Sequence, residues 1–589
     1  MRPASETAIG RLEREAGMDP IRARLLAARQ VDAQDVQDFL QPTLKQSFPD
    51  PSSFTDMDRA VEIILDAIAS DRSCAVFADY DVDGGTAAAI LIRYFRAMGR
   101  HLQLYVPDRI QEGYGPSPEA FATLKARGVE LIITVDCGAA AVTALESAQN
   151  IGVDIVVIDH HLMHGAIPHA AALVNPNRPD CQSGMGTLTA AGVAFVLVAG
   201  LNRRARARGM FGNPNDTPEH RRVEPDIRQW GDLAALGTLC DVAPLRGFNR
   251  AIVTHGLKVL SRTDNPGLRA LSGVAGLSAP DKVWHATFTL GPRLNAGGRI
   301  GEADLAARLL SSDDPMEVGP LAVRLDKLNA ERREIEAQIL DDAIAAAERQ
   351  LAKAPNQAVI VVGAENWHPG VVGIVAARLK EKFFKPAIAV GWGTGFGPYG
   401  KGSGRSIEGV NLGAGIAKAA QAGLLIAGGG HAMAAGLTIE PKRMEEFAQF
   451  LSDALVAEYE KAPDARTQSI DIVLRVEAVT NALAQFLETL EPFGPANPEP
   501  CIVLPLVRAV FCKRMGADGT HLRVTLEGES GARLEAVAFR CVGTALGDAL
   551  EQRSEAIHVA GRLSKDRWNG REKLKFEIAD VALPHLVAS

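Results

Sequence analysis

The chain has 589 residues, of which 47% are hydrophobic and 23% are charged, and its net charge is −8. This composition is ordinary for folded domains, so it excludes intrinsic disorder and a collagen-like fibre, and the length predicts three or four domains of ~100–200 residues. The net negative charge argues against a polybasic binder, although an acidic body can carry local basic grooves for nucleic acid.

The sequence carries no membrane or secretion signal. No stretch reaches the ~18 apolar residues of a transmembrane helix, and the first residues lack the apolar segment of a secretory signal. The seven cysteines are an odd number, widely scattered and without a CxxC pair, which is typical of reduced thiols. We therefore expect a cytoplasmic protein that does not bind membranes.

The first elements in chain order are helical, and an α/β domain follows them. Residues 1–50 are polar with helical spacing and predict an N-terminal helical appendage. In residues 51–262, the apolar runs CAVFA, HLQLYV, ELIITV and DIVVI alternate with helical patterns. This alternation is typical of a mainly parallel sheet. Inside this domain, the arginine-rich stretch 202–228 is interpreted as a solvated surface insertion, with a nucleic-acid contact as the less favoured alternative.

Three further parts follow. Residues 263–354 form a connector, in which Pro320 suits a first helical turn and apolar residues then share one face to about Ala354. Such a helix would be on the order of 50 Å long. Residues 355–461 predict a second, smaller and glycine-rich α/β domain. Residues 462–589 contain short alternating strands that predict a small β-barrel.

Acidic residues follow three of the predicted strands. One group lies just past CAVFA, Asp136 directly follows ELIITV, and Asp159-His160-His161 follow DIVVI. Because the carboxyl ends of parallel strands meet at one edge of a sheet, we expect these side chains to converge. Asp241 follows a helical segment and, taken alone, is more typical of a helix cap. The group after CAVFA comprises Asp79, Asp81 and Asp83.

Clustered carboxylates repel one another strongly in a low dielectric, so either some stay protonated or cations bind. Oxygen-rich sites with one or two imidazoles suit Mg²⁺ or Mn²⁺ better than zinc. Two such ions can clamp both oxygens of a phosphoryl displacement and activate a water molecule. The sequence therefore predicts a two-metal site for phosphoester chemistry.

At these residues the chain resembles the DHH phosphoesterase superfamily and, within it, the exonucleases specific for single-stranded DNA. The resemblance covers roughly residues 50 to 585, and its motifs occur in the order found in that family. They are DYDVDG (79–84), PDRIQEGYG (107–115), TVDCG (134–138), IDHH (158–161), NPN (175–177), GTLCDVAPL (237–245), GPRLNAGGRIG (291–301), GKGSGRS (400–406), GGGHAMAAG (428–436) and EPFGPANPEP (491–500).

The resemblance implies a fold and an activity. The fold is a parallel-sheet DHH domain, a long connector helix, a DHH-associated domain and a terminal OB-fold barrel. The activity is 5′-to-3′ hydrolysis of single-stranded DNA to mononucleotides, with two Mn²⁺ or Mg²⁺ ions, in DNA repair and recombination. His161 would sit near the scissile phosphate, and Asp159 would orient His160. The implied metal ligands are Asp79, Asp81, Asp83, Asp136, His160 and Asp241.

A second set of residues is expected to bind the strand, because phosphate needs fixed cationic donors and close backbone approach. For each arginine taken singly, a solvated turn is an equal alternative, and a glycine-rich turn alone is only a loop. Trp568, in a hairpin-like Asn-Gly turn, would stack on a base. Ser403 and Arg405 are implied to hold the 5′-terminal phosphate. The full set is Arg109, Arg293, Asn295, Arg299, His368, Ser403, Arg405, Gly429, Gly430, His431 and Trp568.

Two alternative functions are weighed against this one. A DHH-type phosphodiesterase for cyclic dinucleotides or short oligonucleotides would share the catalytic residues, but it would need neither the barrel nor the connector. A non-catalytic DHH-like scaffold should lack some acidic ligands, whereas all of them are present here. As partners, the resemblance implies single-stranded DNA with a 5′ end, a single-strand-binding protein and a RecQ-type helicase. We expect the protein itself to be a monomer.

Overall fold

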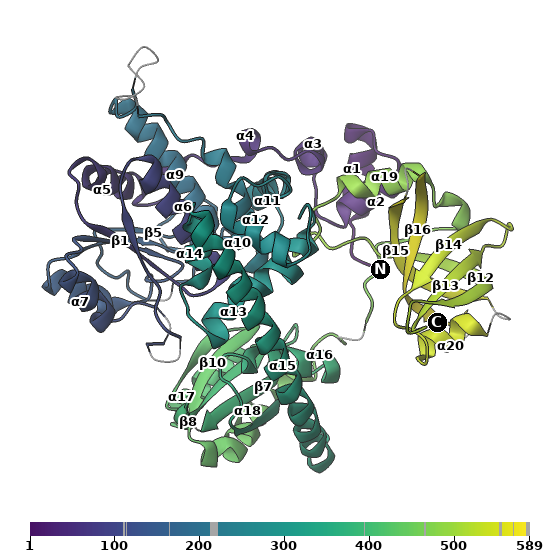
Figure 1. Cartoon of the computed structure of the whole chain (residues 1–589). Coiled ribbons are helices and arrows are strands. Elements are labelled where there is room, and N and C mark those ends of the chain that lie inside the picture. Colours follow the sequence, from purple (N-terminus) through teal and green to yellow (C-terminus); the bar gives the residue numbers. More distant parts are fainter. Residues whose placement is uncertain are drawn as a thin grey trace. The chain divides into compact units, whose positions relative to one another are not determined.

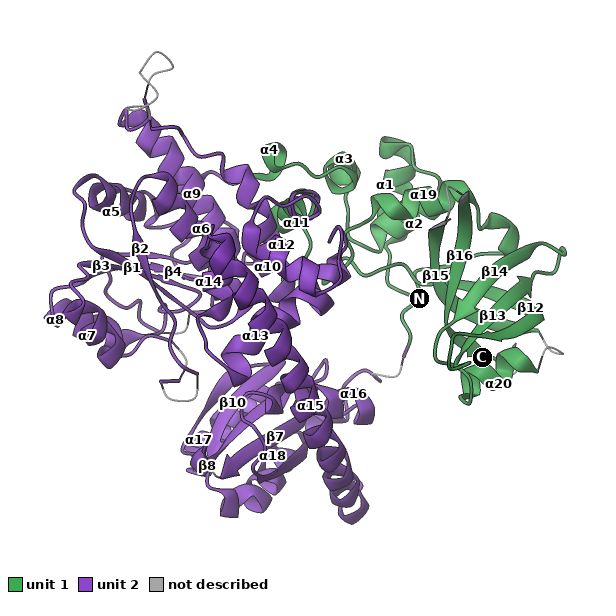
Figure 2. Cartoon of the chain, in the orientation of Figure 1, with its two compact units in different colours: residues 1–48, 242–255, 468–589 green, residues 49–241, 256–467 purple. Residues whose placement is uncertain are grey.

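The computed structural model describes residues 1–109, 112–113, 115–163, 165–212, 222–393, 395–464, 467–552, 556–568 and 571–584. It divides into two compact units, one formed by residues 49–241 and 256–467 and the other by residues 1–48, 242–255 and 468–589 (Figure 2). Within the described ranges, no helix combines the length and apolar character needed to cross a membrane.

The larger unit begins with a five-stranded parallel sheet in the order β2-β1-β3-β4-β5. Strands β1 and β5 of this sheet are labelled in Figure 1. Helices cover both faces, since α7 and α8 share a core with Phe77 and Ile132, and α6 contacts α9 on the other side. Its strands are β1 (Cys74–Ala78), β2 (Leu102–Tyr105), β3 (Leu131–Val135), β4 (Asp154–Ile158) and β5 (Ala172–Val174). Its helices are α5 (Met57–Ala69), α6 (Val82–Ala97), α7 (Pro118–Ala126), α8 (Val142–Asn150) and α9 (Ala190–Ala207), with η2 (Pro51–Ser53) before them.

A helical segment leads from this sheet to the connector. Its elements are η3 (Ile227–Trp230), α10 (Gly231–Cys240), α11 (Gly247–Leu260), α12 (Pro266–Val274), the π-helix η4 (His285–Leu290), α13 (Gly291–Ile300) and α14 (Leu305–Ser311). The long helix α15 (Pro315–Lys353) follows, and it starts earlier than the sequence predicts. Asp314 caps it and Pro315 occupies its first turn, so Pro320 lies inside the helix instead of opening it.

The glycine-rich domain holds a mixed sheet in the order β6-β7-β8-β10-β9, in which β6 and β7 are parallel and the other pairs antiparallel. The end of α15 and α16 pack with β6 and β7 on one face, and α17 and α18 cover the other. The elements are β6 (Ile360–Glu365), α16 (Val372–Phe383), β7 (Ala387–Gly393), β8 (Gly397–Arg405), α17 (Leu412–Gln421), β9 (Ala427–His431), β10 (Ala434–Ile439), η5 (Pro441–Arg443) and α18 (Met444–Tyr459).

The smaller unit is a five-stranded barrel in the order β12-β13-β14-β16-β15, closed by pairing of β12 with β15. Its elements are β11 (Ile472–Val473), η6 (Val476–Ala478), α19 (Asn481–Thr489), β12 (Ile502–Met515), β13 (His521–Glu527), β14 (Arg533–Ala538), α20 (Ala545–Glu551), β15 (Ile557–Trp568) and β16 (Arg571–Ala582). The predicted fold class, two α/β domains joined by a long helix and followed by a barrel, is thus confirmed.

The N-terminal helices share the hydrophobic core of this barrel unit. Leu12, Leu25 and Leu26 are buried in one cluster with Leu490 and Ile502. These helices are α1 (Glu6–Ala16), α2 (Pro20–Ala27), η1 (Ala33–Asp35), α3 (Val36–Leu40) and α4 (Leu44–Ser47). The segment predicted as an appendage is therefore a structural part of the barrel unit.

Candidate active site

The first acidic group is arranged by the turn from β1 into α6. Asp81 caps α6, and its Oδ1 accepts hydrogen bonds from the backbone N–H groups of Asp83 at 2.8 Å and Gly84 at 3.1 Å. Gly84 is required here, because a Cβ at this position would come within 2.5 Å of the carbonyl oxygen of Asp79. The tight turn therefore places three carboxylates at one strand end.

The ends of β3 and β4 lie beside this turn. Hydrogen bonds continue past the strands, from the Asp79 N–H to the Val135 carbonyl at 3.3 Å and from the Asp136 N–H to the Ile158 carbonyl at 3.1 Å. Asp136 has a φ of 61°, a left-handed conformation that Asp adopts more readily than most residues. The loops after three parallel strands are thereby fixed at one edge of the sheet.

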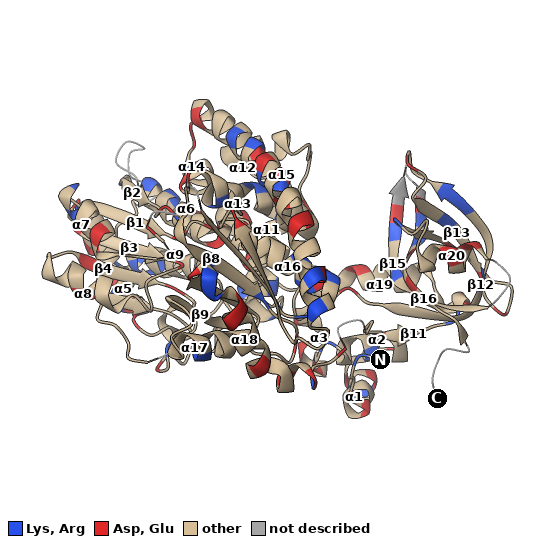
Figure 3. Ribbon diagram, turned by 90° about the horizontal axis from the view of Figure 1, so that it is seen from below, with Lys and Arg blue, Asp and Glu red and all other residues tan. Residues whose placement is uncertain are grey.

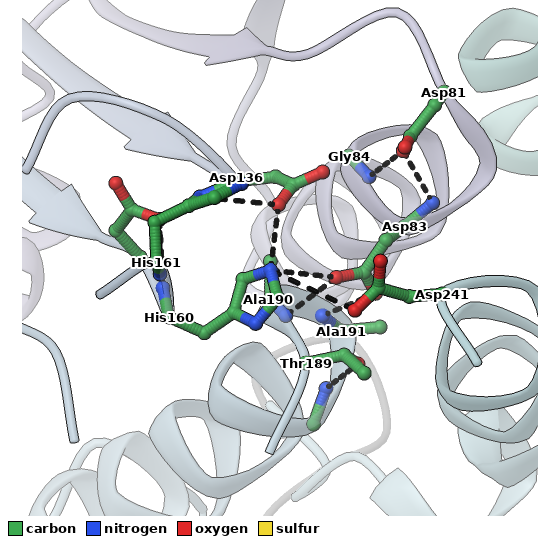
Figure 4. A network of polar contacts seen from close by, with 12 residues as sticks. Asp81, Asp83, Gly84, Asp136, His160, His161, Thr189, Ala190, Ala191 and Asp241 are labelled. Atoms are coloured by element: carbon green, nitrogen blue, oxygen red, sulfur yellow. Dashed lines mark hydrogen bonds and ion pairs between the residues drawn. The ribbon is translucent and has the colours of Figure 1, made fainter. Parts of the chain in front are cut away.

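His160 lies at the centre of the converging carboxylates (Figure 4). Its Nε2 is 3.1 Å from Oδ1 of Asp136, 3.7 Å from Oδ2 of Asp83 and 3.9 Å from Oδ2 of Asp241. Asp241 comes from the C-terminal end of α10, so the helix-cap position places it in the cluster. The structure therefore brings together residues separated by more than 150 positions in the chain.

Three overlapping groups of side chains could each hold a cation. In each group, one ligand atom per residue lies within 4.8 Å of the others. Oδ1 of Asp79 is buried and has no hydrogen-bond partner among the described residues, so a cation would satisfy it. The groups are Asp79, Asp81 and Asp136; Asp83, His160 and Asp241; and Asp136, His160 and His161.

Electrostatics also favour a cation at this cluster. Burial and the neighbouring carboxylates raise the pKa of Asp79 and of Asp136 well above the ordinary value, and they raise the pKa of Asp241 to about 8. Without a positive charge, these groups cannot all ionise at neutral pH. The donor set is mostly carboxylate oxygen with imidazole, which fits Mn²⁺ or Mg²⁺.

Asp159 contacts a different histidine from the one that the resemblance implies. Its Oδ1 lies 2.8 Å from Nδ1 of His161 and accepts the backbone N–H groups of His160 at 2.7 Å and His161 at 3.1 Å. The expected contact of Asp159 with the His160 ring is thus replaced by a contact with the His161 ring. His160 points its Nε2 at Asp136 instead.

Arginines predicted to bind phosphate gather near the cluster. Burial and repulsion from Arg109 lower the pKa of both Arg299 and Arg405, that of Arg299 to about 10. The same two causes lower the pKa of His368. Arg109 also lies over the ring of Tyr80, with its Cζ 5.2 Å from the centroid. Arginines that repel one another in this way attract an anion.

The other predicted residues of α13 are arranged differently. Nε of Arg293 donates to Asp326 at 2.8 Å and its Nη1 to the carbonyl of Thr289 at 2.8 Å, so its guanidinium is already engaged. Asn295 is half-buried on the same helix. Nη1 of Arg299 donates to the Gly370 carbonyl at 3.3 Å, which links α13 to the loop before α16.

The glycine-rich domain contributes a nearly bare sheet face. Nη1 of Arg405 donates to Oγ of Ser403 at 3.0 Å, and Ser403 stands opposite Gly436, which in turn stands opposite Gly429. A Cβ at Gly429 or Gly436 would meet no atom within 4 Å, so this row leaves open space above the sheet. Gly430 and His431 belong to the same exposed strand, β9.

The structure gives no support for DNA binding by Trp568 or by the arginine-rich stretch 202–228. Trp568 ends β15, and its side chain lies outside the described part of the structure. In the arginine-rich stretch, residues 213–221 are not among the described residues, and the remaining arginines mostly pair with acids. Arg204 and Arg208 pair with Glu62, and Arg206 with Glu224. These pairs support the surface interpretation of the stretch.

Sequence reasoning missed Tyr80 and Arg332. Tyr80 lies between two predicted metal ligands, and its contact with Arg109 follows only from the fold. Arg332 is 9% exposed on α15, and its Nε has no hydrogen-bond partner among the described residues. Its charge also lowers the pKa of Arg299. The only available signal was the helical spacing of α15, which marks apolar residues and does not single out one arginine.

Comparison with known proteins agrees with this geometry. Three family models match the chain: the DHH family N-terminal domain at residues 73–237, the DHHA1 domain at 356–457 and the RecJ OB domain at 470–580. The single-stranded-DNA-specific exonuclease RecJ of Bacillus subtilis is 34% identical over 97% of this chain and 69% of its own length. That of Escherichia coli is 33% identical over 96% of both chains.

A solved structure shows the same architecture. RecJ of Thermus thermophilus in complex with Mn²⁺ matches with a TM-score of 0.79 and 28% identity, covering 99% of this chain and 79% of the other. The likeness extends over both α/β domains and the barrel. The chain therefore belongs to the RecJ family of single-stranded-DNA-specific exonucleases.

Proposed function

We propose that this protein is a metal-dependent exonuclease that hydrolyses single-stranded DNA from the 5′ end to mononucleotides, in DNA repair and recombination. The observation that carries the proposal is the convergence of carboxylates on His160, where Asp136, Asp83 and Asp241 all lie within 4 Å of its Nε2. The membership of the RecJ family supports the choice of substrate.

We assign the metal ligands to six residues of these three overlapping groups. Bound Mn²⁺ or Mg²⁺ would supply Lewis-acid activation of the phosphate and of the attacking water. Asp136 and His160 each belong to two groups, so they would hold cations where the groups overlap. The full proposed set is Asp79, Asp81, Asp83, Asp136, His160 and Asp241.

His161 is proposed to act on the scissile phosphate. Burial lowers its pKa, but the hydrogen bond to Asp159 and the nearby carboxylates outweigh burial and raise the pKa to about 9. The ring is therefore a cation at neutral pH, with Nδ1 on Asp159. A fixed cation at this point stabilises the extra negative charge of the transition state.

The strand is proposed to lie over the arginines and the bare sheet face. Arg109 and Arg299 would hold phosphates near the metal site, and Ser403 with Arg405 would hold the 5′-terminal phosphate. A planar guanidinium matches phosphate oxygens, and the row from Ser403 to Gly429 lets a nucleotide approach the backbone. His368 and His431 flank the same region as further polar contacts.

The barrel is proposed to bind the strand farther from its 5′ end. Phe511 and Phe539 are each more than 40% exposed, and Nζ of Lys575 lies 5.0 Å from the Phe539 centroid. Exposed rings beside cations suit single strands of any sequence. Residues of both charge signs occur on the barrel strands β13 and β14 (Figure 3). The exposed rings, and not a net positive charge, therefore carry this proposal. We further propose that the protein acts as a monomer on strands that a helicase and a single-strand-binding protein supply.

The test is hydrolysis of a 5′-phosphorylated single strand with and without Mn²⁺. We expect release of mononucleotides that depends on the metal and is abolished by Asp136→Asn. The matched control is Asp154→Asn, because Asp154 is an exposed residue at the opposite end of β4. Equal turnover of Asp136→Asn and the wild type, or preference for a cyclic dinucleotide over the strand, would overturn the proposal.

A further inference from the structure

Two large aromatic rings are exposed on one short helix of the larger unit. The π-helix η4 buries Ala286 and Leu290, whereas Phe288 is 80% exposed and Trp284, just before the helix, is 55% exposed. Aromatic residues make up only 5% of the chain, so two exposed rings four residues apart form an unusual apolar surface. π-Helical turns are themselves frequent at functional sites.

The buried face of η4 packs against the helix end that carries a proposed metal ligand. Sγ of Cys240 lies 3.9 Å from the carbonyl oxygen of Ala286, and a Cβ at Gly291 would come within 2.7 Å of the same sulfur. Cys240 is followed directly by Asp241. The backbone that presents the rings therefore packs against the end of α10 that carries Asp241.

The same backbone continues into the strand-binding region. η4 runs without a break into α13, whose Arg299 belongs to the arginine group beside the metal site. Thr289 in η4 accepts a hydrogen bond from Nη1 of Arg293 at 2.8 Å, which ties the two helices together. The rings and Arg299 are thus carried by one uninterrupted run of helical backbone.

The Trp284 ring is supported in its exposed position. Its centroid lies 4.0 Å from that of the His285 ring, at an interplanar angle of 52°. Nδ1 of His285 in turn accepts the backbone N–H of Lys282 at 3.2 Å. A ring held in place in this way loses little conformational freedom when a ligand stacks on it.

We propose that Trp284 and Phe288 form a stacking platform for unpaired bases of the strand whose end occupies the metal site. This inference rests on the proposed function and deepens it, because it assigns a base-binding surface to the helix that packs against the Asp241 end of α10. Every base has an aromatic face, so stacking is tolerant of sequence and contributes ~1–3 kcal/mol per base. A strand threaded past the two rings would also be held in single-stranded form.

The first test compares a long and a short substrate in the full-length protein with Mn²⁺. The variant is Trp284→Ala/Phe288→Ala, and the substrates are a 5′-phosphorylated oligothymidylate of about 20 nucleotides and the corresponding dinucleotide. We expect KM for the long strand to rise about 10- to 100-fold relative to KM for the dinucleotide. The conservative variant Trp284→Phe/Phe288→Tyr should keep the wild-type ratio. The matched control is Met316→Ala, because Met316 is an exposed apolar residue on a different helix, α15.

The second test removes bases instead of rings. Abasic positions near the 5′ end should weaken binding by the wild type but cause no further loss in the alanine variant. Additive losses, an unchanged KM ratio, or equal changes for both substrates would overturn the platform. If thermal stability fell while the ratio stayed the same, the rings would cover another protein surface. If the wild type cleaved neither substrate, the proposed function would fail, and metal-free binding of the long oligothymidylate would still test the platform.

Discussion

Asp159 holds His161 through a hydrogen bond of 2.8 Å between Oδ1 and Nδ1. The same carboxylate accepts the N–H of Ala139 at 2.9 Å, so its orientation is fixed by the loop after β3. Burial raises the pKa of Asp159, but the bond and charge of His161 outweigh it and lower the pKa to about 2. The two residues therefore form an ion pair at neutral pH, with the imidazolium directed by a buried anion.

This pair predicts the effect of Asp159→Asn. The amide cannot hold His161 as a cation, so kcat with Mn²⁺ should fall about 10- to 100-fold, as for other residues that orient a ligand or an acid. The measurement is steady-state hydrolysis of a 5′-phosphorylated strand. Asp154→Asn on the same strand β4 should leave kcat unchanged, because Asp154 pairs only at the surface with Arg72. Wild-type kcat in Asp159→Asn would remove the pair from the mechanism.

The Ser403–Arg405 pair predicts dependence on the 5′ phosphate. Hydrogen bonds to a charged group contribute about 1.5–3 kcal/mol, so Arg405→Met should raise KM for a 5′-phosphorylated strand about 10- to 100-fold. KM for the same strand with a 5′-hydroxyl should change much less, because that strand lacks the phosphate that Arg405 would bind. Arg378→Met is a suitable control, because Arg378 is an exposed arginine of α16 paired with Glu381. Equal effects on both substrates would show that Arg405 binds elsewhere on the strand.

Asp232 predicts a pH-dependent stability. Its carboxyl is buried in the first turn of α10, with Oδ2 2.5 Å from Oγ1 of Thr263, and burial raises its pKa from 3.8 to about 6. The folded state therefore binds this proton more tightly than the unfolded state, and the associated stability is present below pH 3.8 and lost as pH rises through about 6.

Asp232→Asn removes that ionisation. The variant should gain up to about 3 kcal/mol of unfolding free energy over the wild type at about pH 8, and much less at about pH 4. Thermal unfolding of both proteins across this range measures the difference. A variant that is less stable than the wild type at high pH would show that the charged carboxylate, not the neutral one, is favoured in the fold.

Arg250 predicts the stability of the barrel unit. Its side chain is 1% exposed and donates to the carbonyl oxygens of Phe39 at 2.8 Å, Glu491 at 2.7 Å and Leu490 at 3.0 Å. Arg250→Met leaves these oxygens without their donors, which should cost about 3–5 kcal/mol. Hydrogen exchange of the backbone amides of residues 489–491 should then accelerate. The neighbouring Arg246→Met loses an exposed contact with Gln30 and a longer one with the carbonyl of Arg29, and it should cost only about 1 kcal/mol.

The sequence predicted those parts of the site that depend only on which residues directly follow a strand or form a glycine run. Asp79, Asp136 and Asp159 were expected together because each follows a parallel strand, and the glycine runs indicated a bare surface in the second domain. Contacts between distant segments could not be predicted in this way. Arg29 donates to Asn497, 468 positions away, and this buried contact makes the N-terminal helices part of the barrel unit. Periodicity records which face of a helix is buried, but it does not identify the partner.

The same limit explains the details of the site that differ from expectation. Arg293 was expected to bind phosphate, whereas Asp326, the residue after the buried Leu325 of α15, accepts a hydrogen bond from its Nε. His161 and His160 are adjacent, and only the loop geometry decides which ring meets Asp159. Side-chain pairing across a site depends on angles that a motif does not encode.

The most direct test of the central claim is anomalous X-ray diffraction at the manganese edge from crystals soaked in Mn²⁺. The account predicts two peaks about 3.5–4 Å apart, enclosed by the carboxylates that converge on Asp136 and His160. A map without peaks at this cluster, or with manganese bound only elsewhere on the protein, would contradict it.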